Sequence, residues 1–467
     1  MIDTFEFRCR IIELALSGKL SVHCNGDGDV SQMLKDINHK KDIAVTDNVP
    51  YEIPSTWKWV KLSDLYKINP KVEADGAKEA AFIPMERISA GFSREFSYEI
   101  KTWDKASKNH TKFADGDVAF AKISPCFENR KSFIAEQLPN GIGGGTTELI
   151  ILRQRAMDPL FTYYVVNDKR FIKNGSSSYK GIVGQQRVKS NVVKNYLVPV
   201  PPIEEQKRIV ERVDEIFKLL DKIDTLQGQY QNNVEVLKSK IIDAGIRGQL
   251  TEQLPEDGTA EELYQQIQAE KAQLIKEKKI KKEKPMPEIT AAEIPFEIPG
   301  NWKWVRWGDV SQSIQYGYNA PALENGRIKM VRISDIQSNE VLWEDVPYCD
   351  IDEDSIETYS LQPNDILFAR TGGTLGKSYL VEEVPEEAVY AGYLIRTRYS
   401  SSLSPRFLKY FMQSSLYWSQ LRNGTIATAQ PNCNGKTLGK MIVPLPPLSE
   451  QKRIVAKVDS VLGAIGK

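Results

Sequence analysis

The alternation of apolar and polar positions predicts one unusually long helix near the middle of this 467-residue chain. From residue 209 onward, apolar residues recur in alternating steps of four and three, a spacing that keeps one stripe facing a partner helix as in a coiled coil. The stripe begins with Ile209, Val213, Ile216, Leu220 and Ile223. The helix is expected to start near Glu204 and to stop near Gly245, which makes a rod roughly 65 Å long.

The beginning of this helix occurs twice in the chain. The text VPVPPIEEQKRIV at 198–210 returns as VPLPPLSEQKRIV at 443–455. In both copies two prolines end the preceding segment, because proline cannot continue a strand ladder. The second copy repeats only the first part of the stripe, with Ile454, Val458 and Val461. The chain is therefore expected to contain two similar units.

A helix predicted over residues 5–16 resembles the end of the long helix rather than its beginning. RIIELALSGKL from Arg10 matches KIIDAGIRGQL from Lys240. The C-terminal and N-terminal helices, joined end to end, would therefore rebuild the central helix. We infer a circular, pseudo-twofold arrangement in which two antiparallel rods hold two recognition domains apart.

Matching landmarks divide the remaining chain into two domains with short β-rich segments. IPSTWKWV from Ile53 corresponds to IPGNWKWV from Ile298, and GDVAFAK from Gly116 corresponds to NDILFAR from Asn364. The predicted fold is mixed α/β, with two α/β domains joined and separated by long antiparallel coiled-coil helices. The expected parts are an N-terminal helical segment (1–49), a first domain (50–203), a central helical region (204–293), a second domain (294–448) and a C-terminal helix (449–467).

The overall composition excludes several classes of protein but does not identify a partner. The 62 basic residues balance the 62 acidic ones, and 41% of the chain is hydrophobic. No apolar run approaches the length of a membrane span and the first residues carry charges, so we expect a cytoplasmic protein without membrane contact. The five cysteines and three histidines are scattered, so neither a disulfide framework nor a metal site is expected.

The distribution of charge is more informative than its sum. Residues 169–203 and 388–449 lie at the same place in the two units and contain no acidic residue but many lysines and arginines. A run of charge is usually only a solvated face, yet two matching runs favour an anion-binding surface such as one for DNA phosphates. A capping box of Thr259 and Glu262 predicts a helix to about Glu283. The lysine-rich residues 276–284 are interpreted as its solvated end and a linker rather than a DNA-binding arm.

No catalytic motif could be identified. GGTLGKS at 372–378 lacks the spacing of a P-loop. Neither Pro-Pro pair has the preceding Asn or Asp and the following aromatic residue that an adenine methyltransferase would show. A nucleophile elbow, a carboxylate pair and a histidine-based triad are likewise not recognisable. We therefore expect no catalytic residues in this chain.

Taken together, these features resemble a specificity subunit of a type I restriction–modification enzyme over essentially the whole length. The resemblance rests on the repeated Pro-Pro-x-x-Glu-Gln-Lys-Arg joins, the Gly-Lys-Leu turn at Gly18 and a series of blocks in order. The blocks are FAKISPCFENRK from Phe120, GGGTTEL from Gly143, VGQQRV from Val183, FARTGGTLGK from Phe368 and AQPNCNGK from Ala429. The helical N-terminus and the short C-terminal helix depart from the commonest layout, and the circular arrangement accommodates both.

The resemblance implies a non-catalytic protein whose two domains each read one half of a split sequence in double-stranded DNA. The helices would set the gap and bind two modification subunits. Methyl transfer with S-adenosylmethionine and ATP- and Mg²⁺-dependent cleavage would belong to the modification and restriction subunits, so this chain would bind no cofactor. A self-contained DNA-modifying enzyme and a helical scaffold without sequence specificity are the alternatives. Methyl transfer by the purified chain and competition by unrelated DNA would distinguish them.

The same blocks supply candidate DNA contacts, since long polar side chains reach phosphates and base edges. In the first domain they are Lys122, Arg130, Lys131, Thr146, Thr147, Gln185 and Arg187. In the second domain they are Tyr316, Arg332, Arg370, Thr371, Lys377, Gln430 and Asn432. Structural roles compete with DNA contact: Thr146 and Thr147 can cap a strand, Arg332 can pair with Asp335, and Gln430 can bond to loop backbone. The DNA target itself is not predicted.

Overall fold

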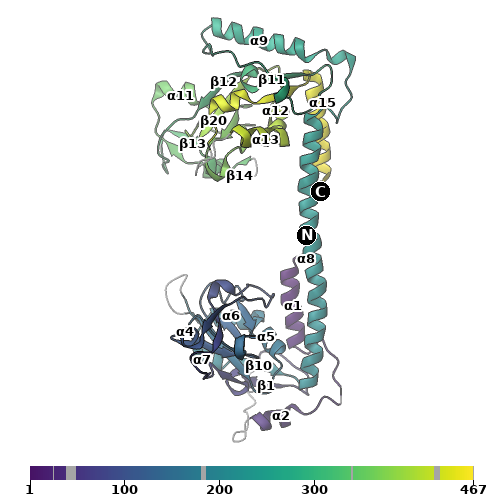
Figure 1. Cartoon of the computed structure of the whole chain (residues 1–467), viewed down its shortest axis with the longest axis vertical. Coiled ribbons are helices and arrows are strands. Elements are labelled where there is room, and N and C mark those ends of the chain that lie inside the picture. The colour runs from purple at the N-terminus through teal and green to yellow at the C-terminus, as the bar shows by residue number, and fades with distance from the viewer. Residues whose placement is uncertain (25, 38–48, 180–185, 338–339, 425–431, 466–467) are drawn as a thin grey trace. The chain divides into compact units, whose positions relative to one another are not determined.

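The computed structural model describes residues 1–24, 26–37, 49–179, 186–337, 340–424 and 432–465 (Figure 1). They form two compact units, residues 1–229 and residues 230–467. One helix, α8 (Ile203–Ile246), contributes residues to both units and has 44 residues. The long helix predicted from the apolar stripe is therefore present. Within the described ranges, none of the helices combines the length and the apolar character that a membrane crossing requires.

Unit 1 contains two four-stranded sheets and a short two-stranded one. The sheets have the strand orders β2-β9-β6-β7, β4-β3-β8-β5 and β1-β10, and all pairs are antiparallel except β3 with β8. β6 and the first four residues of β9 are buried without interruption, so both read as continuous apolar runs rather than as alternating ones. The strands are β1 (Lys58–Lys61), β2 (Tyr66–Ile68), β3 (Glu79–Ile83), β4 (Glu99–Thr102), β5 (Thr111–Ala114), β6 (Val118–Ala121), β7 (Ser132–Ile134), β8 (Ile142–Gly145), β9 (Leu149–Gln154) and β10 (Leu197–Val200).

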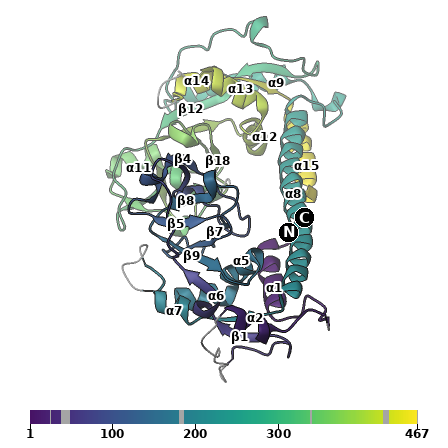
Figure 2. The ribbon, with the colours of Figure 1, turned by 60° about the horizontal axis from the view of Figure 1, so that its bottom comes forward.

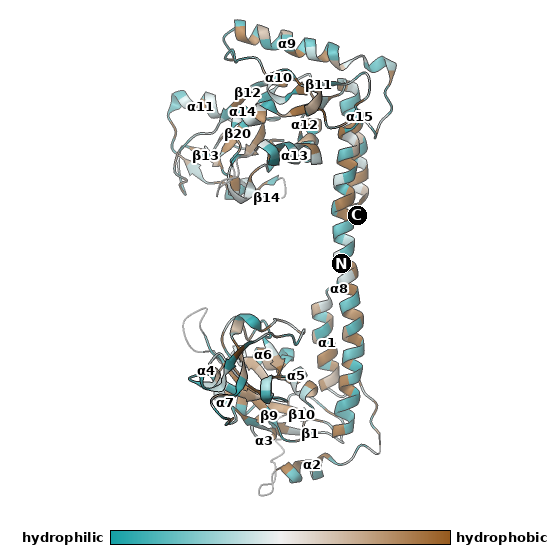
Figure 3. Cartoon of the chain, in the orientation of Figure 1, coloured by the Kyte–Doolittle hydropathy of each residue, from teal (hydrophilic) through white to brown (hydrophobic). Residues whose placement is uncertain are grey.

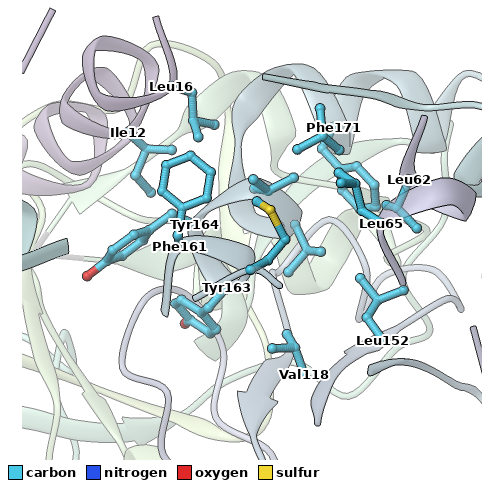
Figure 4. Packing of buried hydrophobic residues seen from close by; sticks show 14 of the residues in the cluster. Ile12, Leu16, Leu62, Leu65, Val118, Leu152, Phe161, Tyr163, Tyr164 and Phe171 are labelled. Atoms are coloured by element: carbon cyan, nitrogen blue, oxygen red, sulfur yellow. The ribbon is translucent and has the colours of Figure 1, made fainter. Parts of the chain in front are cut away.

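The main core of unit 1 lies where helices α1 and α5 meet the sheet strands. Ile12 and Leu16 of α1 gather with Phe161 and Tyr164 of α5 (Figure 4), and all four side chains are at most 2% exposed. Proline at the first position of α5 and the Asp158 side chain, which accepts two main-chain N–H groups, start that helix. The helices of this unit besides α8 are α1 (Thr4–Leu16), α2 (Val30–Ile37), α3 (Leu62–Leu65), α4 (Trp103–Ser107), α5 (Pro159–Asn167), α6 (Lys169–Ser176) and α7 (Ser190–Lys194).

Unit 2 repeats the main sheet of unit 1 with the order β12-β20-β17-β18, beside the smaller sheets β16-β13-β19, β11-β21 and β14-β15. Its strands are β11 (Lys303–Arg306), β12 (Ser311–Tyr316), β13 (Ile328–Val331), β14 (Ile336–Gln337), β15 (Glu340–Val341), β16 (Tyr348–Cys349), β17 (Ile366–Ala369), β18 (Ser378–Leu380), β19 (Ala388–Tyr390), β20 (Leu394–Tyr399) and β21 (Ile442–Leu445). Its helices besides α8 are α9 (Ala260–Lys276), α10 (Trp307–Val310), α11 (Glu353–Tyr359), α12 (Pro405–Phe411), α13 (Ser415–Gly424), α14 (Gly435–Lys440) and α15 (Leu448–Ile465).

The helix predicted from the capping box at Thr259 is present but shorter than expected. Thr259 and Glu262 form the reciprocal cap of α9, which ends at Lys276 and not near Glu283. The turn after the helix holds Lys278 at φ 60°, a left-handed conformation that stops an α-helix. The lysine-rich residues 276–284 therefore include only the last residue of the helix.

The acidic residue shared by GDVAFAK and NDILFAR has a structural role in both sheets. Asp117 binds the guanidinium of Arg153 with two contacts of 2.7 Å and accepts the N–H of Ala114. In unit 2, Asp365 binds Arg398 at 2.9 Å and accepts the N–H of Gln362. Each buried carboxylate thus joins the turn before the central strand to the neighbouring strand. This pairing explains why the landmark recurs.

Within each unit a shorter helix lies beside α8, as the two views of Figures 1 and 2 agree. In unit 1, Arg8 of α1 binds Asp221 at 2.6 Å, while Ile2 bonds to Gln227. In unit 2, the position of Gly245 lies against Ile454 of α15. Apolar and polar residues alternate along these helices (Figure 3), which is the pattern of a helix with one buried face.

Part of the predicted stripe is buried in the cores of the two units. Ile209, Val213 and Leu220 lie in the core of unit 1 and Ile454 and Val458 in that of unit 2, whereas Ile216, Ile223 and Val461 are only partly covered. Other large apolar side chains of α8 are exposed. They are Leu219, Leu226, Tyr230, Val236 and Leu237, with exposed fractions of 44–63%.

The repeated Glu-Gln-Lys-Arg text attaches each helix to its domain through a fully buried carboxylate. Glu205 accepts the indole N–H of Trp57 at 2.9 Å and the hydroxyl of Ser21 at 2.7 Å. Glu450 accepts the indole N–H of Trp302 at 2.8 Å and the hydroxyl of Thr251 at 3.1 Å. Both carboxylates are 0% exposed. The recurrence of this text therefore has a structural cause, because it secures the helix to the Trp-Lys-Trp segment.

A buried lysine in unit 2 leads to a pH prediction. Lys409 donates to the carbonyl and hydroxyl of Ser378, and burial lowers the pKa of its amine to about 8. Between about pH 8 and the ordinary value of 10.5, the unfolded chain binds more protons at this site than the folded chain, so the stability should rise with pH. The gain relative to a Lys409→Met variant should reach roughly 2–3 kcal/mol.

Urea unfolding of both proteins at pH 7.5 and pH 9.5 measures this difference. The tyrosines titrate in both proteins, so their contribution cancels in the comparison. Equal pH dependence of the free energy of unfolding in the two proteins would contradict a buried amine with a lowered pKa.

Candidate nucleic-acid interface

Three segments of unit 1 meet at the end of the central strand β6. The N–H of Lys122, the residue after β6, donates to the carbonyl of Glu148 at 2.8 Å, and the N–H of Val188 donates to the carbonyl of Lys122 at 2.9 Å. Ile123 and Arg187 form an isolated antiparallel bridge. Main-chain bonds therefore bring together Lys122, Thr146 with Thr147, and Arg187, which belong to three separate blocks of the sequence. We call these three segments the strand-end site.

The strand-end site of unit 1 contains a carboxylate that orients a guanidinium group. Arg187 binds Glu148 through Nε at 2.9 Å and through Nη2 at 2.7 Å, and its side chain is 48% exposed. The hydrogen bond from Arg187 lowers the pKa of Glu148, and the charge of Lys122 adds to the effect. Such a bidentate pair fixes the plane of the guanidinium. The site therefore presents a lysine, an oriented arginine and an acceptor in a small area.

Unit 2 has the same strand-end site at the end of β17. The N–H of Arg370 donates to the carbonyl of Tyr393 at 3.2 Å, and the N–H of Cys433 donates to the carbonyl of Arg370 at 3.0 Å. Thr371 and Asn432 form the isolated bridge. By this register Arg370, Tyr393 and Asn432 take the positions of Lys122, Glu148 and Arg187.

Aromatic side chains hold the arginine of the unit 2 site. The guanidinium carbon of Arg370 lies 4.9 Å from the centre of the Tyr316 ring, and the Tyr316 hydroxyl accepts the N–H of Gly435 at 3.0 Å. The Nε atom of Arg370 is buried and has no hydrogen-bond partner among the described residues. Tyr393, beside it, is 62% exposed. A guanidinium stacked in this way can present its Nη edge to the paired acceptors of guanine.

Arg130 and Lys131 of the first domain make contacts inside the protein. The Arg130 side chain is 8% exposed, donates to the carbonyl of Asn167 at 3.1 Å and lies over the rings of Phe5 and Phe92. This burial gives Arg130 a packing role in place of the expected DNA contact, because its block folds back beneath the surface. Lys131 donates to the carbonyl of Met85 at 2.9 Å.

The remaining candidates divide between capping roles and exposed positions. Thr146 accepts the N–H of Glu148 at 3.3 Å, as its capping alternative predicted, while Thr147 is exposed. Arg332 makes two contacts, of 3.1 and 2.8 Å, with Asp335, again the competing role. Lys377 is exposed at the end of the loop that begins at Thr371. Gln185 and Gln430 lie outside the described residues.

Glu148 and Tyr393 belong to the strand-end sites but were not predicted. Glu148 follows the GGGTT text directly, yet nothing marks it as the partner of an arginine 39 positions later. Their place depends on the pairing of β6 with β9 and of β17 with β20. The described residues contain no cluster of three or more His, Cys, Asp or Glu side chains suited to a metal ion.

Comparisons with known proteins all find the same protein family. Residues 54–235 and 299–466 match the family described as type I restriction modification DNA specificity domain. The chain is 32% identical to the EcoAI specificity subunit of Escherichia coli, over 99% of this chain and 89% of the relative. It is 30% identical to the EcoEI specificity subunit of Escherichia coli, over 97% and 88%.

Two solved structures share the fold. One comes from work on complex assembly and conformational transition of the type I R-M system, with a TM-score of 0.64, 20% identity and coverage of 89% of this chain and 93% of that chain. The other is the HsdS subunit of Thermoanaerobacter tengcongensis, with a TM-score of 0.51, 19% identity and coverage of 90% and 93%.

Proposed function

The chain belongs to the family of type I restriction–modification specificity subunits, and from this premise we propose how it recognises DNA. Specificity subunits are non-catalytic, so the alternative of a self-contained DNA-modifying enzyme is set aside. Each strand-end site reads one half of a bipartite sequence in double-stranded DNA. S-adenosylmethionine, ATP and Mg²⁺ are used by the modification and restriction subunits and not by this chain.

One observation supports this proposal above the others. The two units repeat the same main-chain frame at the end of β6 and β17 but fill it with different side chains. Unit 1 offers Lys122 and the Arg187–Glu148 pair, whereas unit 2 offers Arg370 on Tyr316 with Asn432. A repeated frame with different polar groups suits two unlike half-sequences, because base edges differ in their donors and acceptors.

The helices provide spacing and docking in this proposal. If each domain reads three to five base pairs and the centres of the half-sites lie about one turn apart, ~34 Å or ~10 base pairs, the gap is roughly five to seven base pairs. The exposed apolar side chains of α8, which include Leu226 and Tyr230, would be covered by two modification subunits, since contiguous exposed apolar residues mark protein contacts. A circular pseudo-twofold arrangement with antiparallel rods would give both modification subunits equivalent surfaces.

Replacing Arg370 with alanine is expected to relax one half of the DNA motif and leave the other half unchanged. A bidentate arginine–guanine contact contributes ~1–3 kcal/mol of discrimination, or about 5- to 150-fold at one base pair. Mapping methylated bases in cells that co-express the chain with a cognate modification subunit measures both halves at once. The wild-type chain should give a split motif with a fixed gap.

Arg332→Ala is the matched control, because its guanidinium is already bound by Asp335. Arg370→Lys should relax the same base pair as Arg370→Ala, since lysine keeps the charge but loses the planar fork. An unchanged motif in Arg370→Ala would remove this residue from base reading. Wild-type binding that unrelated DNA competes away equally well would instead favour a scaffold without sequence specificity.

A further inference from the structure

Unit 2 carries an open groove of about 840 Å³ that the strand-end site does not use. It lies between the β15 segment, β18 with the residues after it, α12 and α15. Its apolar surface is formed by Val341, Trp343, Tyr379, Leu380, Tyr410 and Leu462. Glu340, Glu382 and Glu383 line the same groove and are exposed. The groove therefore combines an aromatic floor with a carboxylate rim.

One residue of the rim, Glu340, lies in a strongly acidic stretch of the chain. Residues 333–369 include ten Asp or Glu and no Lys or Arg. Three carboxylates, those of Glu382, Glu383 and Glu340, act together on Tyr379, whose pKa is raised by burial and then by these charges. All three carboxylates line the groove together with Tyr379. Glu340 and Glu383 take part in no ion pair within the described part of the chain.

The two basic residues of the groove do not neutralise this rim. Arg406 bridges Glu382 at 3.5 Å and Asp459 of α15 at 3.0 Å, so its charge is shared between two acids. Lys409 is 8% exposed, and its amine bonds to Ser378 in the interior. The rim therefore keeps an excess of negative charge. DNA, itself an anion, is not the ligand that such a surface attracts.

Unit 1 has a smaller groove of about 440 Å³ at the corresponding place, and Phe5, Phe92 and Phe217 line it. Phe92 follows the 3₁₀ helix at 85–87 by five residues, as Glu340 follows the one at 333–335. The Phe92 ring lies 5.4 Å from that of Phe5 and 5.7 Å from that of Phe217. In unit 2 the place of Phe217, twelve residues after the buried glutamate of the helix, is taken by the smaller Leu462. The carboxylate rim is thus a feature of unit 2, where Glu340 takes the place of Phe92, whereas acidic and basic residues line the groove of unit 1 in equal number.

We infer that this groove binds a lysine- or arginine-bearing segment of a protein partner. The alkyl stems of such side chains pack on aromatic and aliphatic surface while their charged heads reach carboxylates at the edge. Trp343 and the two tyrosines also provide ring faces for a cation. The contact is separate from the strand-end site, so it does not depend on which DNA sequence is read.

The test uses the full chain and a defined probe. The probe is a fluorescein-labelled 14-residue peptide of leucine and arginine, and a second peptide with glutamate in place of arginine is the negative probe. Fluorescence anisotropy should show salt-sensitive binding of the arginine peptide only. The double variant Glu340→Lys/Glu383→Lys should weaken that binding at least tenfold, because it reverses the charge of the rim.

Asp350→Lys/Glu357→Lys is the matched control, since both residues are exposed in the same acidic stretch but do not line the groove. This variant should bind the peptide as the wild-type chain does. Equal losses in the two double variants, or no binding by the wild-type chain, would overturn the proposal. Self-association that the groove variant abolishes would also overturn it, because the lysine-rich residues 276–284 of a second copy would then be the occupant.

A second measurement identifies the partner protein that occupies the groove. With p-benzoyl-phenylalanine at Leu342, which is 62% exposed beside the groove, photo-crosslinking in the purified complex with modification and restriction subunits should attach a peptide rich in Lys or Arg. Crosslinks to acidic or uncharged peptides, or none at all, would overturn the proposal. The methylated DNA motif should be the same for Glu340→Lys/Glu383→Lys as for the wild-type chain. A failure of the groove proposal can therefore be told apart from a failure of the proposed DNA reading by Arg370.

Discussion

Replacing Glu205 with alanine is expected to destabilise unit 1 by roughly 3 kcal/mol or more while leaving the core of unit 2 intact. The buried carboxylate accepts bonds from Trp57 and Ser21, and His23 Nδ1 lies 2.6 Å from Glu205 Oε1. Alanine would leave the indole N–H buried without an acceptor and would add a cavity. Removing one partner from a buried charged network typically costs about 3–5 kcal/mol.

Hydrogen exchange followed by mass spectrometry resolves this effect by unit. In Glu205→Ala, amides of α1, β1 and the first part of α8 should exchange faster, and those of β17 and β20 should not. In Glu450→Ala, amides of unit 2 should exchange faster and those of unit 1 should not, because Glu450 accepts hydrogen bonds from Trp302, Thr251 and Gln253 in unit 2.

Lys207→Ala is the control for both variants, since Lys207 is exposed and, among the described residues, pairs only with Glu204 three positions before it. It should change the free energy of unfolding by less than about 0.5 kcal/mol. Uniform faster exchange in both units after either glutamate replacement would show that the two domains unfold together, which contradicts separate attachment of each helix.

Deleting residues 228–234 from α8 is expected to abolish methylation at the original split sites and to create new ones with a shorter gap. These seven residues correspond to nearly two helical turns, so the apolar stripe returns to almost the same face. They shorten the helix by about 10 Å, equivalent to at most three base pairs along DNA. Tyr230 and its neighbours in this stretch are exposed or partly exposed, so no domain core is disturbed.

The methylated motif of the deletion variant should contain both original half-sequences. A matched control replaces the same seven residues with alanine, which keeps the length of the helix and should keep the gap. Altered half-sequences in the deletion variant would contradict the proposal that the length of α8 sets the gap between the half-sites. An unchanged gap would do the same, because the spacing would then come from another part of the complex.

The sequence by itself predicted the elements whose signals are local or repeated. The four-and-three stepping identified α8, since a helix facing apolar surface must repeat every 3.6 residues, and the prolines before Glu204 and the glycine at 245 located its ends to within a residue. The capping box at Thr259 marked the start of α9 but not its end, because the stop depends on the left-handed Lys278 and not on the apolar period. The repeated Pro-Pro-x-x-Glu-Gln-Lys-Arg text also indicated two similar units and the resemblance to specificity subunits.

Only the tertiary structure decided which candidate side chains come together. Lys122 and Arg187 belong to blocks about sixty residues apart, and main-chain pairing around β6 brings them to one place. The same folding buries Arg130 only eight residues from Lys122, because the intervening turn redirects the chain. Glu148 and Tyr393 became part of the strand-end sites through strand register, which no local pattern specifies. Sequence periodicity determines the face that a residue takes within its own element, whereas long-range strand pairing determines its neighbours.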